Sequence, residues 1–156
     1  MTTSTDHPLA LVFYAAGIPA PQGSKRHVGG GRMIESSKKV APWREDVRNS
    51  AELAAAEQGW EAPEGPVAVD VTFWLPRPKS HPKTRRTWPT TKPDVDKLLR
   101  STCDALTSAG VIADDARIVD LDAHKRYVHP AALRHDHEPA KPGAHITIIN
   151  LEGETP

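Results

Sequence analysis

Residues 67–75 read VAVDVTFWL and carry the clearest structural signal in the chain. Hydrophobic side chains alternate there with Asp70 and Thr72, which predicts a β-strand with one buried face. Working outward from this strand, the patterns predict a strand and a helix before it, then a helix and two strands after it. The predicted elements cover residues 9–17, 42–58, 67–75, 94–108, 116–128 and 144–151. This β-α-β-α-β-β order predicts an α+β fold, with two main helices packed on a mixed sheet of about four strands.

The length of 156 residues fits a single domain. We expect a disordered leader over residues 1–8, a single folded α+β domain over residues 9–151 and a flexible tail over residues 152–156. The single cysteine, Cys103, excludes an internal disulfide and any multi-cysteine zinc site. The N-terminal apolar run is too short to span a membrane and lacks the basic flank of a secretory signal. We therefore expect a cytoplasmic protein without a membrane partner.

Charge is balanced in number but uneven along the chain. There are 20 Lys and Arg and 20 Asp and Glu, so net charge alone argues against binding to nucleic acid. The basic residues, however, concentrate in residues 22–39 and 77–92, and the second stretch contains no acid. Acids crowd instead into residues 94–122. Basic loops beside an acidic cluster suit a metal-dependent enzyme that acts on polyphosphate, although ordinary solvated loops explain each basic stretch by itself.

Residues 92–106, KPDVDKLLRSTCDAL, allow two interpretations of a helix start. In the first, Asp94 caps the helix, Asp96 interacts with the helix dipole, and Asp96, Arg100 and Asp104 form a charge ladder. In the second, Asp94 and Asp96 are ligands of a metal ion. Acids are common in the first turn of any helix, so this segment alone favours the first interpretation.

Asp114 and Asp115 follow shortly after this helix and strengthen the second interpretation. If the strand that starts near Arg117 pairs close to the helix start, three or four carboxylates meet. Mg²⁺ takes such oxygen ligands and usually keeps waters and substrate phosphate oxygens. It lowers the pKa of a bound water and stabilises an in-line displacement at phosphorus, while nearby Lys and Arg offset the developing charge.

Residues 92–125 closely resemble the core of the RusA family of Holliday-junction resolvases, whose pattern runs roughly KPDxDNxxKxxxDALxxxGxxxDDxQ. The segment GIPAPQGSKR at 17–26 and the closing ITI at 146–148 sit where the family has its entry motif and last strand. The resemblance implies a RusA-like fold and a homodimeric, Mg²⁺-dependent endonuclease that can also use Mn²⁺ and needs no nucleotide cofactor. It implies paired nicks in four-way junction DNA during recombination and repair, and a phage or prophage origin. The matching positions are Lys92, Pro93, Asp94, Asp96, Asp104, Ala105, Leu106, Gly110, Asp114 and Asp115.

The same resemblance assigns the site residues. The catalytic, metal-binding aspartates of the family fall on Asp94, Asp96 and Asp115, with Asp114 as an assisting metal ligand. The functional lysine of the family falls on Arg100, which is a departure. A second departure is Lys97, where the family has asparagine, so either Arg100 or Lys97 supplies the catalytic positive charge.

Lysines and arginines in and beside the basic loops are the predicted contacts to the DNA backbone. Trp88 within the second loop either stacks on an unpaired base or pins the loop to the core, and the usual burial of tryptophan favours pinning. Two alternatives to the resolvase stay open: a nuclease for flaps or other branched DNA, and a junction-binding protein without catalysis. The predicted DNA contacts are Lys25, Arg26, Arg32, Lys83, Arg85, Arg86, Lys92, Lys97 and Lys125.

Overall fold

The computed structural model describes residues 7–23, 25–27, 33–35 and 38–156. It confirms the predicted α+β fold, a mixed four-stranded sheet with two helices, and each predicted element ends within two residues of the observed one. A small two-stranded hairpin and two short 3-10 turns complete the structure. The elements are β1 (Ala10–Ala16), β2 (Lys25–His27), β3 (Met33–Glu35), α1 (Val40–Gln58), β4 (Val67–Leu75), α2 (Val95–Ser108), η1 (Asp115–Arg117), β5 (Ile118–Tyr127), η2 (Ala131–Leu133) and β6 (Gly143–Asn150).

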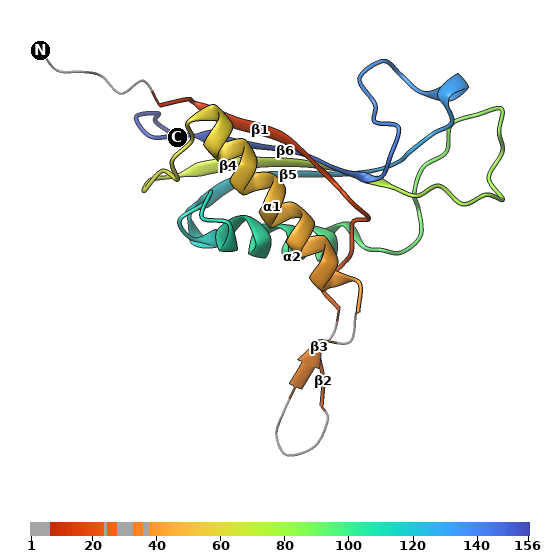
Figure 1. Ribbon diagram of the computed structural model, residues 1–156, viewed down its shortest axis with the longest axis horizontal. Coiled ribbons are helices and arrows are strands. Elements are labelled where there is room, and N and C mark those ends of the chain that lie inside the picture. The colour runs from red at the N-terminus through yellow and green to blue at the C-terminus, as the bar shows by residue number, and fades with distance from the viewer. Residues whose placement is uncertain (1–6, 24, 28–32, 36–37) are drawn as a thin grey trace, which may run out of the picture.

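The main sheet has the strand order β1-β6-β4-β5. β6 runs antiparallel to both β1 and β4, whereas β5 runs parallel to β4. Both helices cover the same face of this sheet (Figure 1). β5 is therefore an edge strand whose outer side pairs with no other described strand.

The core lies between this sheet face and the two helices. Val69, Val71 and Phe73 on β4 are at most 2% exposed, as the alternation in the sequence predicts. Trp43 from α1 is completely buried, and its Nε1 donates to Thr102 Oγ1 on α2 at 3.1 Å. This hydrogen bond satisfies the indole N–H in the apolar interior and joins the two helices.

Two glycines meet specific steric demands. Gly59 ends α1 with a φ of 67°, the left-handed conformation that glycine adopts without a steric penalty. Gly143 lies opposite β1, where an added Cβ would stand 2.4 Å from the Ala15 carbonyl oxygen and 2.5 Å from the Tyr14 ring. A side chain at position 143 would therefore push β6 away from β1.

Two long loops, residues 76–93 and 128–142, extend past one end of the sheet (Figure 1). Arg86 joins them by an ion pair with Glu138 at 2.5 Å and a hydrogen bond to the Leu133 carbonyl at 2.9 Å. The backbone N–H of Thr87 adds a bond to His129 Nε2 at 3.1 Å. We call these two segments the paired loops. Their irregular backbone is ordered by these specific polar contacts.

Some predictions fall outside the described residues or stay untested. Residues 1–6 of the expected leader and the predicted DNA contact Arg32 lie outside them. The domain limits 9–151 and the flexible tail 152–156 remain predictions. Within the described ranges, no helix has the length and apolar character needed to cross a membrane.

Candidate active site

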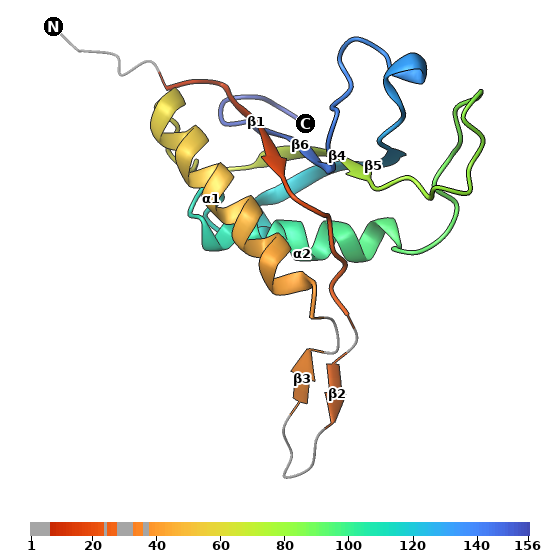
Figure 2. The same cartoon turned by 45° about the vertical axis from the view of Figure 1, so that its right-hand side comes forward.

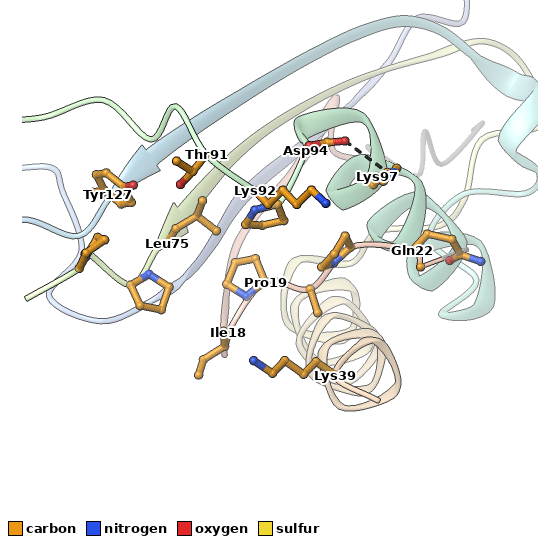
Figure 3. Close-up of a pocket in the computed structure, with 16 residues that line it drawn as sticks. Ile18, Pro19, Gln22, Lys39, Leu75, Thr91, Lys92, Asp94, Lys97 and Tyr127 are labelled. Atoms are coloured by element: carbon orange, nitrogen blue, oxygen red, sulfur yellow. Dashed lines mark ion pairs between the residues drawn. The ribbon is translucent and has the colours of Figure 1, made fainter. Parts of the chain in front are cut away.

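Asp94 and Asp96 lie exposed at the start of α2. Asp94 occupies the N-cap position with an extended backbone, yet its side chain makes no capping hydrogen bond within the described part of the chain. Its Oδ2 lies instead 3.6 Å from Lys97 Nζ, an ion pair in which both side chains are half-exposed (Figure 3). The capping interpretation is therefore wrong for the Asp94 side chain, and the carboxylate is accessible to a cation.

Lys125 fixes the backbone that leads into Asp94. Its Nζ donates to the carbonyl oxygens of Thr91 at 2.8 Å and Pro93 at 2.9 Å. Because Lys125 belongs to β5, these bonds tie the start of α2 to the edge of the sheet. The structure thus gives Lys125, a predicted DNA contact, an internal positioning role.

Asp114 and Asp115 lie at the other end of α2. Asp115 Oδ1 accepts a hydrogen bond from Thr107 in the last turn, and Asp114 Oδ1 accepts one from the N–H of Ala116 at 2.8 Å. A helix rises about 1.5 Å per residue, so Asp96 and Thr107 stand roughly 17 Å apart along the axis. Figure 2 shows α2 running from the side of the paired loops to the opposite side, where β5 begins.

The four carboxylates therefore do not meet within one chain. Nowhere in residues 7–23, 25–27, 33–35 and 38–156 do three His, Cys, Asp or Glu side chains gather closely enough to hold a metal ion. The short connection between α2 and β5 explains the separation, because β5 must begin near the place where α2 ends. The sequence carried this signal in the few residues between the predicted helix and strand.

The predicted charge ladder of Asp96, Arg100 and Asp104 on α2 does not form as ion pairs among the described residues. Asp104 pairs with Arg44 of α1 at 3.2 Å. Arg100 is exposed and, among the described residues, takes part in no ion pair. Arg100 follows Asp96 by four residues, so the two side chains project from the same side of the helix. Its guanidinium is consequently available to a phosphate near Asp96.

The predicted DNA contacts fall into different environments. Lys83, Arg85 and Lys92 are exposed. Arg86 is engaged with Glu138, and its hydrogen bond to that carboxylate, together with its charge, lowers the pKa of Glu138 to about 2. Much of the Arg86 charge is thus offset within the chain. The side chains of Lys25 and Arg26, on β2, lie outside the described part of the structure.

Trp88 does not pin its loop to the core, so that prediction was wrong. The side chain is 68% exposed, and the guanidinium carbon of Arg126 lies 4.9 Å from its ring centroid. The preceding residues Arg86 and Thr87 make the anchoring contacts with the other loop, which leaves Trp88 facing outward. An exposed tryptophan beside cationic side chains is an environment suited to stacking on a nucleobase.

A groove of about 480 Å³ adjoins Asp94 and Lys97 (Figure 3). One wall is the segment 18–23 that follows β1, and the other consists of residues around the end of β4 and residues 91–94. The sequence patterns did not reveal this groove because its walls are distant in sequence. Its lining includes Ile18, Pro19, Lys39, Leu75, Thr91 and Tyr127.

Exposed aspartates at a helix start, beside basic loops on an α+β scaffold, are the features expected of a class of proteins that bind a cation through carboxylates and phosphate through lysines and arginines. Comparison with known families makes this class specific. The family described as "Endodeoxyribonuclease RusA" matches residues 16–134, which is most of the chain. The chain belongs to this family of Holliday-junction endonucleases.

A curated relative matches a smaller part. The "Uncharacterized protein YqaN" of Bacillus subtilis (strain 168) is 38% identical over 72 residues. The match covers 40% of this chain and 50% of that protein, so the chain spans about half the length of this relative.

Proposed function

We propose that this protein is a Mg²⁺-dependent endodeoxyribonuclease that resolves Holliday junctions by paired nicks in DNA recombination and repair. Its membership of the RusA family supports the endonuclease activity. A phage or prophage origin is part of the proposal and rests on the sequence resemblance alone. The structural observation that carries the proposal is the pair of exposed carboxylates, Asp94 and Asp96, at the start of α2 next to the paired loops. The Asp94 side chain makes no capping hydrogen bond within the described residues. Mn²⁺ is expected to replace Mg²⁺, because both accept carboxylate oxygens.

The donor chemistry of the helix start fits a hard divalent cation. Asp94 and Asp96 bring two exposed carboxylates to the start of α2, and Lys125 holds the backbone in front of them. When bound, Mg²⁺ supplies Lewis-acid activation of the attacking water and the scissile phosphate. Arg100, one turn into the helix, is proposed to offset charge on that phosphate. Lys97 already neutralises part of the Asp94 charge and is the second candidate for this role.

A homodimer completes the proposed site. In a two-fold dimer, every contact between the subunits occurs twice. If the start of α2 in one subunit lies against the end of α2 in the partner subunit, the dimer therefore contains two identical sites. Asp114 and Asp115 of the partner subunit would then join Asp94 and Asp96. The exposed edge of β5 supports such an association, since Val119 is 59% exposed and Leu121 is 45% exposed there. Two equivalent sites also suit a four-way junction, which is itself two-fold symmetric.

The paired loops and the β2–β3 hairpin form the proposed DNA surface. The hairpin projects away from the body of the protein (Figure 2), and its base is held near the site because the Gln22 N–H donates to the Lys97 carbonyl at 3.0 Å. The paired loops extend on the side where α2 begins. Lysines and arginines on both projections are proposed to bind phosphates without reading sequence, which predicts salt-dependent affinity.

One cleavage assay tests the proposal. Labelled four-way junction, flap and linear duplex are incubated with and without Mg²⁺, using the native protein, Asp96→Asn and the matched carboxylate-to-amide control Glu57→Gln on the exposed side of α1. We expect symmetric nicks in the junction only with Mg²⁺, lost in Asp96→Asn and kept in the control. Preference for the flap would make the protein a nuclease of other branched DNA. Junction binding without nicks under Mg²⁺ or Mn²⁺ would make it a binding protein without catalysis.

A further inference from the structure

We propose that the groove beside Asp94 binds one unstacked nucleobase of the DNA strand, next to the phosphodiester bond to be cut. This inference rests on the proposed function, because it places part of the substrate beside the same carboxylates. The volume of about 480 Å³ lies within the range of roughly 300–1,000 Å³ that is usual for small-ligand sites. A base with its sugar is a ligand of that class.

The lining of the groove suits the flat faces of a base. Apolar side chains dominate it, including Ile18 and Leu75, while Thr91 and Tyr127 each bring a hydroxyl group at the end of the groove away from Lys97 (Figure 3). Apolar walls accept the faces of a base, and hydroxyl groups can bond to its polar edge. Five proline rings complete the lining: Pro19, Pro21, Pro76, Pro78 and Pro93.

The charges around the groove indicate a nucleic-acid strand. Lys39, Lys92 and Lys97 all line it, and Asp94 is the single acid among its described lining residues. Three ammonium groups around an apolar floor complement a base that carries a phosphate on either side. An uncharged apolar ligand would not use these cations. A strand that enters this groove also brings its backbone next to Asp94.

The walls of the groove are already held in place. Ser101, fully buried on α2, donates to the Ala20 carbonyl at 2.7 Å, and the Gln22 N–H donates to the Lys97 carbonyl at 3.0 Å. Lys125 holds the opposite wall through its two carbonyl partners. A pre-organised groove loses less entropy on binding than a mobile one, so it can extract a base from a weakly stacked junction centre.

The test compares two truncations at equal exposure. Ile18 lies on the groove wall and Leu53 on α1, and both are 61% exposed. The cleavage position is first mapped with the native protein. Two junctions are then made, one with 2-aminopurine beside the cleavage position and one with 2-aminopurine within an arm. Asp96→Asn protein is added to each with Ca²⁺, and fluorescence is measured. We expect fluorescence to increase only for the 2-aminopurine beside the cleavage position. Adding Ile18→Ala should reduce that increase and weaken junction binding about threefold to tenfold, whereas adding Leu53→Ala should change neither.

A second measurement separates this inference from the proposed function. The methyl signals of Ile18 are followed by NMR while the native protein is titrated with a 5′-phosphorylated dinucleotide. A shift that saturates supports the groove as a nucleotide site even if no junction is cut. If the junction is cut but neither the 2-aminopurine fluorescence nor the Ile18 signals change, the groove inference is overturned while the proposed function stands. If the Ile18 signals shift with protein concentration and not with dinucleotide concentration, the groove binds a second copy of the chain, and the inference is overturned.

Discussion

Asp96 and Asp115 stand at opposite ends of one helix: Asp96 lies in the first turn of α2, and Asp115 accepts a hydrogen bond from Thr107 in the last. Both are predicted to serve one metal site, so the partner subunit must supply one of them. This requirement makes the proposed dimer a condition for catalysis rather than only for symmetry.

Mixed dimers test this arrangement. Asp96→Asn and Asp115→Asn homodimers are each expected to be inactive. Mixing them with exchange of subunits should restore one intact site per mixed dimer, because the native Asp96 of one subunit then meets the native Asp115 of the other. Single nicks in the junction, measured on denaturing gels, are the expected product. If the site were built within one chain, both sites of every mixed dimer would carry a change, and activity would stay absent.

Lys125→Met is expected to slow cleavage through the position of Asp94. Losing the two carbonyl partners frees the backbone at Thr91 and Pro93, and a shift of about 1 Å in a catalytic group typically reduces the rate about 100-fold. Single-turnover rates and junction affinity are measured together. We expect the rate to fall 10- to 100-fold, with affinity changed less than about threefold. Lys83→Met, at an exposed loop lysine, is the control, and an equal loss of affinity in both variants would indicate a plain DNA contact for Lys125.

Trp88→Ala is expected to weaken junction binding without affecting folding. The ring is 68% exposed, so its removal leaves no core cavity. Stacking of a base on an aromatic side chain contributes about 1–3 kcal/mol, which corresponds to at least fivefold in affinity. Fluorescence anisotropy with a labelled junction measures the affinity, and thermal melting checks that folding is unchanged. Trp88→Phe should keep most of the affinity, and unchanged binding by Trp88→Ala would exclude stacking.

Acid should separate the paired loops. The bond with Arg86 lowers the pKa of Glu138 from its ordinary value of 4.5 to about 2 in the folded protein. The unfolded chain therefore binds more protons between these values, and this contribution to stability is lost as the pH falls from about 4.5 to about 2. Glu138→Gln should destabilise the protein near neutral pH by about 2 kcal/mol and remove this part of the pH dependence in urea unfolding. An unchanged acid profile would contradict the role of this pair.

Cys103 should resist alkylation in the folded protein. Burial, with the negative charges of Asp115 and Asp104, raises the pKa of its thiol to about 12, and the side chain is only 8% exposed. The reactive thiolate is therefore scarce at pH 8. Iodoacetamide labelling followed by mass spectrometry should be slow for the native protein and fast in guanidinium chloride. Rapid native labelling would show that α2 opens at this position.

The local elements followed from the sequence because their signals are local. The alternation of residues 67–75 determines which face of β4 is buried, since successive side chains of a strand point to opposite sides. Pro42 and Gly59 mark the two ends of α1, because proline fits the first turn of a helix and glycine readily adopts the left-handed conformation that ends one. The run from Asp94 to Asp96 identified the start of α2, and with it one half of the proposed site.

Only the tertiary structure decided which distant groups meet. The parallel pairing of β5 with β4 places Lys125 beside the start of α2 and leaves Asp115 at its far end. Partners of this kind depend on strand order and chain direction, which no local period encodes. The same long-range packing turned Trp88 outward and brought together the walls of the groove beside Asp94. The sequence thus predicted which residues carry the chemistry, and the three-dimensional arrangement decided that one chain brings only half of these predicted residues together, because α2 separates Asp94 and Asp96 from Asp114 and Asp115.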